Sequence, residues 1–384
     1  MTIPDCRPIR AFLEDRHLSL AGKLAESAAR EIASRPAPED DAAARREARV
    51  LLALLGAGGW FEPIRRQDWR SCCLAREALG AASPLADAVF ALQALGTVPI
   101  ILKATPSLRD RWVADAVEGR AMGGFAMTES GAGSDVAAMG TVARRDGNAY
   151  VLSGSKTLIS NAGIADFYTV FVKTDPEAGG KGITAFLVPA DTPGLKFAGA
   201  QVLSAPHPIG EIAFEDCRVP AENRLGEEGR GLALGLQTLD RLRATVGAAA
   251  CGMAGRALSE ALRHARARRQ FGNPLGHFQL IKEKLARMAT GLTAARLLVY
   301  RAAAAADQGA DRVTLEAGMA KAFATETAQE VIDDAIQVLG GSGVLASHPV
   351  DRLYRSVRAL RIYEGTTEIQ HLLIADQLLG DETT

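Results

Sequence analysis

One carboxylate near the end of the chain has the neighbours that a general base needs. Glu364 follows Ile362 and Tyr363 and is followed at once by Gly365. The apolar and aromatic lead-in can partly remove water from the carboxylate and raise its pKa, and the glycine lets the backbone approach a ligand closely. An acidic residue beside glycine is far more often a solvated loop, so this candidate needs support from other segments.

A glycine-rich segment with hydroxyl groups offers the first support. Residues 128–135 follow a strand-like run, and their backbone amides, with the hydroxyls of Thr128 and Ser134, could donate to an anionic or carbonyl-rich ligand. No lysine follows and no βαβ unit surrounds the segment, so it is neither a P-loop nor a dinucleotide fingerprint. On this segment alone, an ordinary Gly/Ser turn is the simpler interpretation.

Three further polar clusters permit a structural or a ligand-binding interpretation. Residues 153–163 place Ser160 and Asn161 at the end of a short predicted strand, where a hairpin is the plain alternative. Residues 266–272 end a long predicted helix with several arginines, which indicates a solvated helix C-terminus or a pyrophosphate partner. Residues 337–343 are either a helix C-cap or a place where backbone approaches a ligand.

Composition limits the class of protein. The chain has 384 residues, more than one hydrophobic core usually serves, so we expect two or three structural regions. Hydrophobic residues make up 48% of it, which excludes a mainly disordered protein. The net charge of −1 favours neither nucleic acid nor an anionic membrane as a partner. Chemistry on a small molecule is the remaining default.

The cysteines and the N-terminus indicate a soluble cytoplasmic protein. The number of cysteines is odd and no metal-type C-x-x-C spacing occurs, so we expect reduced thiols and no metal site. They are Cys6, Cys72, Cys73, Cys217 and Cys251. The first residues lack the basic start and apolar run of a signal peptide, and we expect no segment that approaches the length of a membrane span.

The sequence divides into three predicted domains. Residues 1–119 are rich in Ala, Leu, Arg and Glu and predict a helical domain. Residues 120–226 are richer in Gly, Thr, Ser, Val and Ile and predict a β-domain. Residues 227–384 return to helical patterns and predict a helical bundle.

Individual segments carry these predictions. Residues 41–52 form a dense helical segment, and residues 167–172 and 183–188 are β-branched and aromatic runs typical of strands. The turn residues 146–148 separate two more β-like runs.

Two long helices are predicted in the last region. A stripe with alternating spacing of three and four predicts a bundle helix. It consists of Phe278, Ile281, Leu285, Met288, Leu292, Ala295 and Val299. A second helix is expected from about Arg312 to Leu339, ending at Gly340.

Taken in order, six segments resemble the acyl-CoA dehydrogenase family over nearly the whole chain. They are T-E-x-G-x-G-S-D (Thr128–Asp135), G-x-K-x-x-I-S-N (Gly154–Asn161), F-E-D-C-x-V-P-x-x-N (Phe214–Asn223), R-x-x-F-G (Arg268–Gly272), Q-x-L-G-G-x-G (Gln337–Gly343) and Y-E-G-T-x-E-I-Q (Tyr363–Gln370). The resemblance implies an α+β multidomain fold with an N-terminal helical domain, a central β-barrel-like domain and a C-terminal four-helix bundle. It also implies FAD between the β-domain and the bundle.

The resemblance implies a role in FAD binding for eleven residues. Met127 and Thr128 would lie against the flavin ring, and Ser160 would form a hydrogen bond near the reactive nitrogen N5. The other implied cofactor contacts are Ser134, Arg268, Gln270, Phe271, Gln337, Gly341, Thr366 and Glu368. Those from the arginine-rich segment and from residues 337–343 would come from a neighbouring subunit, so a homotetramer is expected.

The resemblance also implies the reaction. Glu364 would remove the α-proton of an acyl-CoA thioester while a hydride leaves the β-carbon for flavin N5, which gives a trans-2-enoyl thioester. The backbone amide of Glu364 would stabilise charge on the thioester carbonyl. Ser134, Asp240, Arg243 and Gly365 would contact the CoA part or brace the loop, although the helical charges could simply pair with their neighbours.

Alternatives stay open at this point. Some relatives place the base on an earlier helix, but residues 245–248 contain no glutamate. Leu158 stands where relatives usually carry an aromatic residue. A flavin oxidase that reacts directly with oxygen is therefore an alternative to the expected dehydrogenase, which would pass its electrons to an electron-transfer flavoprotein. The acyl group could also be carried by a carrier-protein arm instead of CoA. A scaffold that binds nucleic acid is disfavoured by the intact motif and the charge.

Overall fold

The structure is a computed structural model that describes residues 3–310 and 312–380. The chain forms two compact units, each assembled from separate segments of sequence. Unit 1 contains the described residues up to Pro36, then Asp68–Asp87, and the described residues from Asp240 onwards. Unit 2 contains Ala37–Gln67 and Ala88–Leu239. The order of elements along the chain is helical, β and helical again, as expected, while the predicted domain boundaries stay a prediction.

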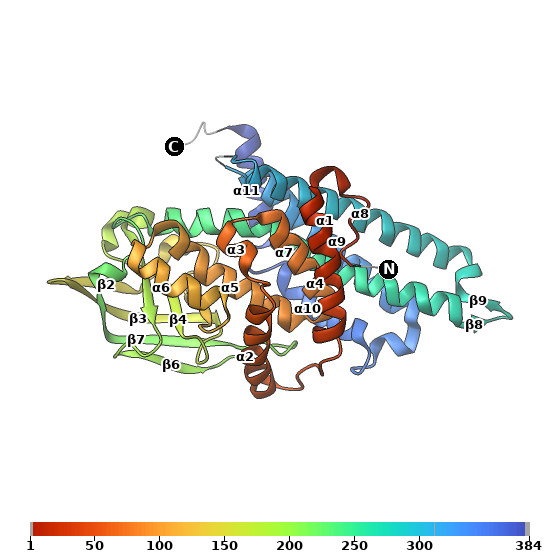
Figure 1. The fold of residues 1–384 in the computed structure, drawn as a ribbon, viewed down its shortest axis with the longest axis horizontal. Helices are drawn as coiled ribbons and strands as arrows, with labels where there is room; N and C mark the ends of the chain where they lie inside the picture. The colour runs from red at the N-terminus through yellow and green to blue at the C-terminus, as the bar shows by residue number, and fades with distance from the viewer. Residues whose placement is uncertain (1–2, 311, 381–384) are drawn as a thin grey trace. The chain divides into compact units, whose positions relative to one another are not determined.

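Unit 2 is built on a seven-stranded sheet with the order β1-β4-β2-β3-β7-β6, in which β5 also pairs with β4 (Figure 1). Its strands are β1 (Gly123–Ala126), β2 (Val142–Asp146), β3 (Ala149–Ser160), β4 (Phe167–Lys173), β5 (Ile183–Pro189), β6 (Leu195–Ala200) and β7 (Ile209–Pro220). The unit also contains α2 (Asp41–Ala57), α3 (Glu62–Arg66) and α6 (Pro106–Val117). The runs predicted as strands at 167–172 and 183–188 are β4 and β5, and both are buried almost throughout.

The hairpin between β2 and β3 shows how local sequence places a longer strand. Asp146 pairs with Ala149, so Gly147 and Asn148 form a two-residue loop, and Gly147 has a φ of +61°. Such loops favour residues that tolerate positive φ. The strand that follows is twelve residues long, which corrects the expected short strand: pairing with β7 extends it as far as Ser160.

The described residues of unit 1 form helices, connecting loops and one small hairpin (Figure 1). Its helices are α1 (Asp15–Ser27), α4 (Trp69–Ala82), most of α7 (Gly231–Ala267), α8 (Gln279–Asp307), α9 (Thr314–Leu339), α10 (Pro349–Leu360) and α11 (Thr367–Leu379). Helix α9 packs against α8, α10 and α11. Its buried face carries many alanines, which let neighbouring helices approach closely. The predicted helix from about Arg312 is α9, and the predicted stripe lies on α8, with Met288, Leu292, Ala295 and Val299 buried.

Helix α5 (Pro84–Lys103) corrects the expectation that no segment approaches the length of a membrane span. It has 20 residues and is long and apolar enough to cross a membrane by length and composition. However, 78% of its most apolar window is buried inside the protein. A core helix has the same composition as a membrane helix, so the burial accounts for the apolar sequence.

Candidate active site

The loop that joins α10 to α11 holds Glu364 in an unusual backbone conformation. Glu364 has a φ of +56° and Gly365 a φ of +92°. A positive φ is uncommon for a residue with a side chain, and such residues gather where the surrounding structure enforces them, often at functional sites. The side chains of Ile362 and Tyr363 remain 53% and 38% exposed, so they shield the loop only in part.

The Glu364 carboxylate is buried and incompletely satisfied. Its Oε2 atom has no hydrogen-bond partner among the described residues. Burial raises the pKa of the Glu364 carboxyl, and the positive charges of Arg76, Lys321 and Arg243 oppose that rise. A carboxylate with a raised pKa and a free oxygen atom has the properties of a general base.

Three side chains hold this loop by its backbone carbonyl oxygens. Gln370 Nε2 donates to the carbonyl oxygens of Glu364 and Gly365, each at 3.2 Å. Arg243 Nε donates to the Glu364 carbonyl oxygen at 3.4 Å, and Lys321 Nζ donates to that of Gly365 at 2.5 Å. These donors come from α11, α7 and α9, so the position of Glu364 is fixed by three helices of unit 1.

Asp240 and Arg243 lie on the predicted helix, α7. They pair with each other, and Arg243 also contacts the Glu364 loop, so each of the two interpretations is supported in part. Arg243 Nη1 lies 2.5 Å from Asp240 Oδ1, an ion pair between residues three apart on a helix. Arg243 also reaches the Glu364 carbonyl oxygen, while Asp240 Oδ2 accepts a hydrogen bond of 2.7 Å from Thr314 Oγ1. The pair therefore braces the loop, and contact with CoA stays a prediction.

Sequence reasoning missed Lys321. The side chain is fully buried on α9, and burial lowers the pKa of its ammonium group to about 8. Lys321 shares a helix face with the buried residues Ala317, Ala320 and Ala324. This position could have indicated its role, because a lysine is seldom placed on a buried helix face without a partner.

Sequence reasoning also missed the buried pair of Arg76 and Asp87. Arg76 donates from Nε and Nη2 to the two Asp87 oxygens at 2.8 and 2.9 Å, and from Nη1 to Thr245 Oγ1 at 3.1 Å. Both residues are also among the charged groups that influence the Glu364 carboxyl. Single charged residues within apolar helices gave no signal that they would meet.

A second group of predicted residues comes together in unit 2, where β1 and β3 end. Thr157 N donates to the Thr128 carbonyl oxygen at 3.0 Å, and Lys156 Nζ donates to the Met127 carbonyl oxygen at 3.1 Å. Ser160 is the last residue of β3, the strand that also contains Lys156 and Thr157, and it is half-buried. Met127, Thr128 and Ser160 are thus placed by the same pair of strand ends.

The ion pair of Lys156 and Glu129 supports this region and was missed as a functional feature. Lys156 is fully buried and its Nζ lies 2.7 Å from Glu129 Oε1. Burial lowers the pKa of the Lys156 ammonium group to about 8, and Glu129 opposes the shift. Glu129 also accepts hydrogen bonds from the backbone amides of Gly140 and Thr141. Glu129 lies in the motif Thr128–Asp135 and Lys156 in the motif Gly154–Asn161, and these positions could have indicated a functional role.

Leu158 adopts a conformation that its sequence did not predict. It has a φ of +55° and its side chain is 54% exposed. Its backbone amide donates to Gln201 Oε1 at 3.0 Å. An apolar side chain is therefore presented to the exterior of unit 2, close in sequence to Ser160.

Most of the remaining predicted cofactor residues lie at exposed positions. Helix α7 ends at Ala267, and the arginine-rich segment continues into the hairpin of β8 (Arg269–Gln270) and β9 (Asn273–Pro274) (Figure 1). Phe271, at its turn, is 91% exposed. Also exposed are Ser134, Arg268, Gln270, Gln337, Gly341 and Glu368. Thr366 caps α11 by accepting a hydrogen bond from the amide of Ile369. The roles of these residues in cofactor binding stay predictions.

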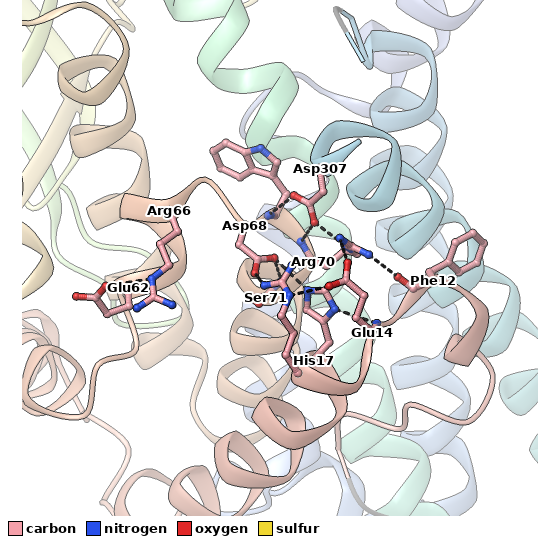
Figure 2. Close-up of polar contacts among 11 residues, drawn as sticks. Phe12, Glu14, His17, Glu62, Arg66, Asp68, Arg70, Ser71 and Asp307 are labelled. Carbon is pink, nitrogen blue, oxygen red and sulfur yellow. Dashed lines mark hydrogen bonds and ion pairs between the residues drawn. The ribbon is translucent and has the colours of Figure 1, made fainter. Parts of the chain in front are cut away.

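A cluster of His17, Asp68 and Asp307 has side chains of the types that bind metals, but other partners occupy it (Figure 2). Arg16 and Arg70 form ion pairs with Asp68 and Asp307. The two carboxylates also accept hydrogen bonds from the first backbone amides of α4. The cluster therefore caps the N-terminus of α4, where negative charge is favourable.

Comparison with known proteins identifies the family. The model for "Acyl-CoA dehydrogenase, middle domain" matches residues 124–217, and that for "Acyl-CoA dehydrogenase, C-terminal domain" matches residues 229–379. Cyclohexane-1-carbonyl-CoA dehydrogenase of Geobacter metallireducens is 36% identical, over 96% of this chain and 99% of that protein.

Solved structures agree. Butyryl-CoA dehydrogenase from Megasphaera elsdenii aligns with a TM-score of 0.89 at 34% identity, over 96% of this chain and 99% of that one. The FAD complex of PigA aligns with a TM-score of 0.87 at 28% identity, over 95% of this chain and 98% of that one. The chain belongs to the acyl-CoA dehydrogenase family. The predicted fold class and FAD are thereby confirmed, and the protein is an oxidoreductase that acts on the CH–CH bonds of acyl-CoA thioesters.

The residues present fit an FAD cofactor. A Cβ atom added to Gly131, Gly133 or Gly341 would meet no atom within 4 Å, so the backbone is open to a ligand at these three positions. Arg268 presents an exposed cation of the kind that binds a pyrophosphate. The apolar side chain of Leu158 is exposed beside the strand end that carries Ser160.

Proposed function

We propose that Glu364 is the base that removes the α-proton of the acyl-CoA thioester, so that the product is a trans-2-enoyl-CoA. One observation carries the proposal: the Glu364 carboxylate is buried, its Oε2 atom is without a partner, and its pKa is raised. A raised pKa makes this carboxylate a stronger base than an ordinary glutamate. The FAD, when bound, supplies the acceptor for the hydride that leaves the β-carbon.

The loop around Glu364 supports the same role. Because its carbonyl oxygens accept hydrogen bonds from Gln370, Arg243 and Lys321, the side chain is held in place before substrate arrives. The Glu364 backbone amide is not used in any hydrogen bond that the structure shows, so it is available to donate to the thioester carbonyl, where negative charge develops.

Cofactor binding is proposed for the two groups of residues described above. Met127, Thr128 and Ser160 would contact the flavin ring. Arg268, Gln270, Phe271, Gln337 and Gly341 would hold the pyrophosphate and adenosine part, with Thr366 and Glu368 near the adenine end and Ser134 shared with CoA. The exposed polar side chains among them, those of Ser134, Arg268, Gln270, Gln337 and Glu368, are accessible to a cofactor shared between subunits.

A homotetramer is part of the proposal. Large apolar side chains remain exposed in unit 1 on α8, α11 and the small hairpin, among them Leu280, Leu372, Leu379 and Phe271. Exposed apolar groups of this size favour association with another surface. Light scattering after gel filtration measures the mass directly, and a monomer that retains FAD would contradict the shared cofactor site.

The experiment that tests the proposed reaction is anaerobic flavin bleaching. The purified protein should be yellow, and a panel of straight, branched and cyclic acyl-CoA thioesters should include one that bleaches the flavin and yields a trans-2-enoyl product by mass spectrometry. Reoxidation should be faster with an electron-transfer flavoprotein than in air, as measured by stopped flow. A protein that binds FAD but is bleached by no member of the panel would contradict the activity on free CoA thioesters.

A further inference from the structure

The hydroxyl group of Ser160 has a partner that the sequence did not indicate. His207 Nε2 lies 2.8 Å from Ser160 Oγ. The two residues are on adjacent segments, because Ser160 pairs with Ile209 in the ladder of β3 and β7. The next backbone amide, that of Asn161, donates to the Pro208 carbonyl oxygen at 2.8 Å. Backbone pairing on one side of the contact therefore fixes the distance between the imidazole and the hydroxyl.

The second nitrogen of the His207 ring is free. Nδ1 is buried and has no hydrogen-bond partner in the described chain. A neutral imidazole donates from one nitrogen and accepts at the other, and the bond at one nitrogen selects the tautomer. His17 shows the contrast: its Nδ1 accepts from the Glu14 amide at 3.1 Å, so its proton lies on Nε2, which faces Asp68 at 3.3 Å (Figure 2). No such bond locks His207.

The surroundings of His207 keep the ring neutral. Its pKa is lowered to about 4, mostly by burial and in part by the guanidinium of Arg45, while the carboxylate of Asp41 opposes the shift. Arg45 forms an ion pair with Asp41 at 2.6 Å and donates to the carbonyl oxygens of Ala162 and Ile209. At neutral pH the ring can therefore donate or accept at Nε2, whereas a protonated ring could only donate.

We propose that His207 is a positioning residue that allows the Ser160 hydroxyl to reverse its hydrogen bond when bound FAD changes redox state. This inference rests on the proposed place of Ser160 beside flavin N5. Oxidised N5 is an acceptor, so His207 donates from Nε2 to Ser160, and the serine hydroxyl is free to donate to N5.

Reduced FAD reverses these roles, because N5 then carries a hydrogen atom and becomes a donor. Ser160 accepts from it and donates its own proton to Nε2 of His207. The neutral ring then carries its proton on Nδ1: Nε2 releases a proton to solvent and Nδ1 takes one up from solvent, so the pair gains and loses no proton overall. The absence of a partner on Nδ1 is what leaves both tautomers open.

The midpoint potential of the bound FAD tests this inference without an acyl-CoA substrate. In His207→Phe, the Ser160 hydroxyl that accepts from reduced FAD has no acceptor for its own proton, which disfavours the reduced state. We expect the ratio of reduced to oxidised FAD at a given potential to fall about tenfold, equivalent to about 30 mV for a two-electron couple. His207→Gln should recover most of the shift, because an amide group can rotate to donate or accept.

Companion variants separate the possible outcomes. Ser160→Ala should shift the potential, and adding His207→Phe to it should cause little further change, since the two residues act as one unit. Thr157→Val removes a hydroxyl from the same strand that contacts Gln201 and Glu211 instead, and should leave the potential unchanged.

Each result then has one meaning. If Ser160→Ala shifts the potential and His207→Phe does not, the inference about His207 is wrong while the flavin site stands. If neither variant shifts it, the proposed place of Ser160 is wrong as well. Should His207→Phe not fold, ¹⁵N-histidine NMR of the unmodified FAD protein decides: the His207 tautomer must change when dithionite reduces the flavin, and an unchanged tautomer overturns the inference.

Discussion

The ammonium group of Lys321 donates a hydrogen bond of 2.5 Å to the carbonyl oxygen of Gly365, the residue directly after Glu364. The same positive charge opposes the rise in the pKa of the Glu364 carboxyl. One buried lysine therefore holds the loop mechanically and influences the protonation of the proposed base.

Lys321→Met should change the pH dependence of flavin reduction. Loss of the positive charge should raise the pKa of Glu364, so the acid limb of the rate profile should move to higher pH. The unmodified enzyme should also lose rate above about pH 8, where Lys321 loses its proton, and the variant should lack this alkaline limb. Single-turnover flavin bleaching across pH measures both limbs, with Lys284→Met, which removes a lysine bound to Asp334, as the control.

Stability should respond to the same lysine with a defined sign. The pKa of Lys321 is lowered from 10.5 to about 8 in the folded protein, so its charged form costs stability at lower pH. Between these two values the unfolded chain binds more protons, and the free energy of unfolding should rise with pH. Lys321→Met should remove the part of this increase in the free energy of unfolding that comes from Lys321. Urea unfolding at several pH values checks it, and equal slopes in both proteins would contradict the assignment.

Glu364→Gln should preserve fold and FAD while slowing flavin reduction roughly 100-fold or more, the scale of a lost general base. Amide and carboxylate have similar shapes, so binding of the thioester should largely survive and the defect should lie in the chemical step. Glu330→Gln, at an exposed position of α9, is the control. If the Glu364 variant bleaches as fast as the parent, another group is the base.

Gly365→Ala should displace the loop. A Cβ atom there would lie 2.4 Å from Gln370 Nε2, the atom that holds two loop carbonyls, and the φ of +92° is unfavourable for alanine. We expect flavin reduction to slow about tenfold or more, and the free energy of unfolding to fall by about 1–3 kcal/mol. Gly309→Ala, which has a φ of +82° and open space around it, separates backbone strain from the clash. Equal effects on rate in the two variants would exclude the clash as the cause.

Arg268→Ala should weaken FAD retention, because a charge-assisted contact to phosphate would be lost. The dissociation constant of FAD, measured by flavin fluorescence during reconstitution, should rise about tenfold, which corresponds to about 1.4 kcal/mol. Arg266→Ala removes an exposed arginine from the last turn of α7, the helix that ends just before Arg268, and serves as the control. An unchanged constant for Arg268→Ala would make it an ordinary surface charge.

Local patterns predicted the elements that depend on local sequence. The turn at Gly147, the apolar strands β4 and β5 and the glycine end of α9 are all present where the sequence placed them. The length of β3 was not predictable in this way, because it depends on register with β7, which lies about fifty residues further along the chain.

The candidate site was predictable as a set of motif residues but not as a network. Lys321 and His207 lie far in sequence from the residues that they contact, and Arg76 lies far in sequence from Glu364, whose pKa it influences; none of the three stands in one of the six motifs. The φ of Glu364 is likewise imposed by anchors on three helices and not by its neighbours in sequence. Spacing along the chain cannot reveal contacts of this kind.

The anchors of the Glu364 loop bind main-chain oxygens, and this separates two properties that evolution can alter. Carbonyl groups are the same whatever side chains the loop carries, so the exposed residue Ile362 can be exchanged without releasing the hold of Gln370 and Lys321. The exposed side chain at this position can therefore vary while the carboxylate keeps its place.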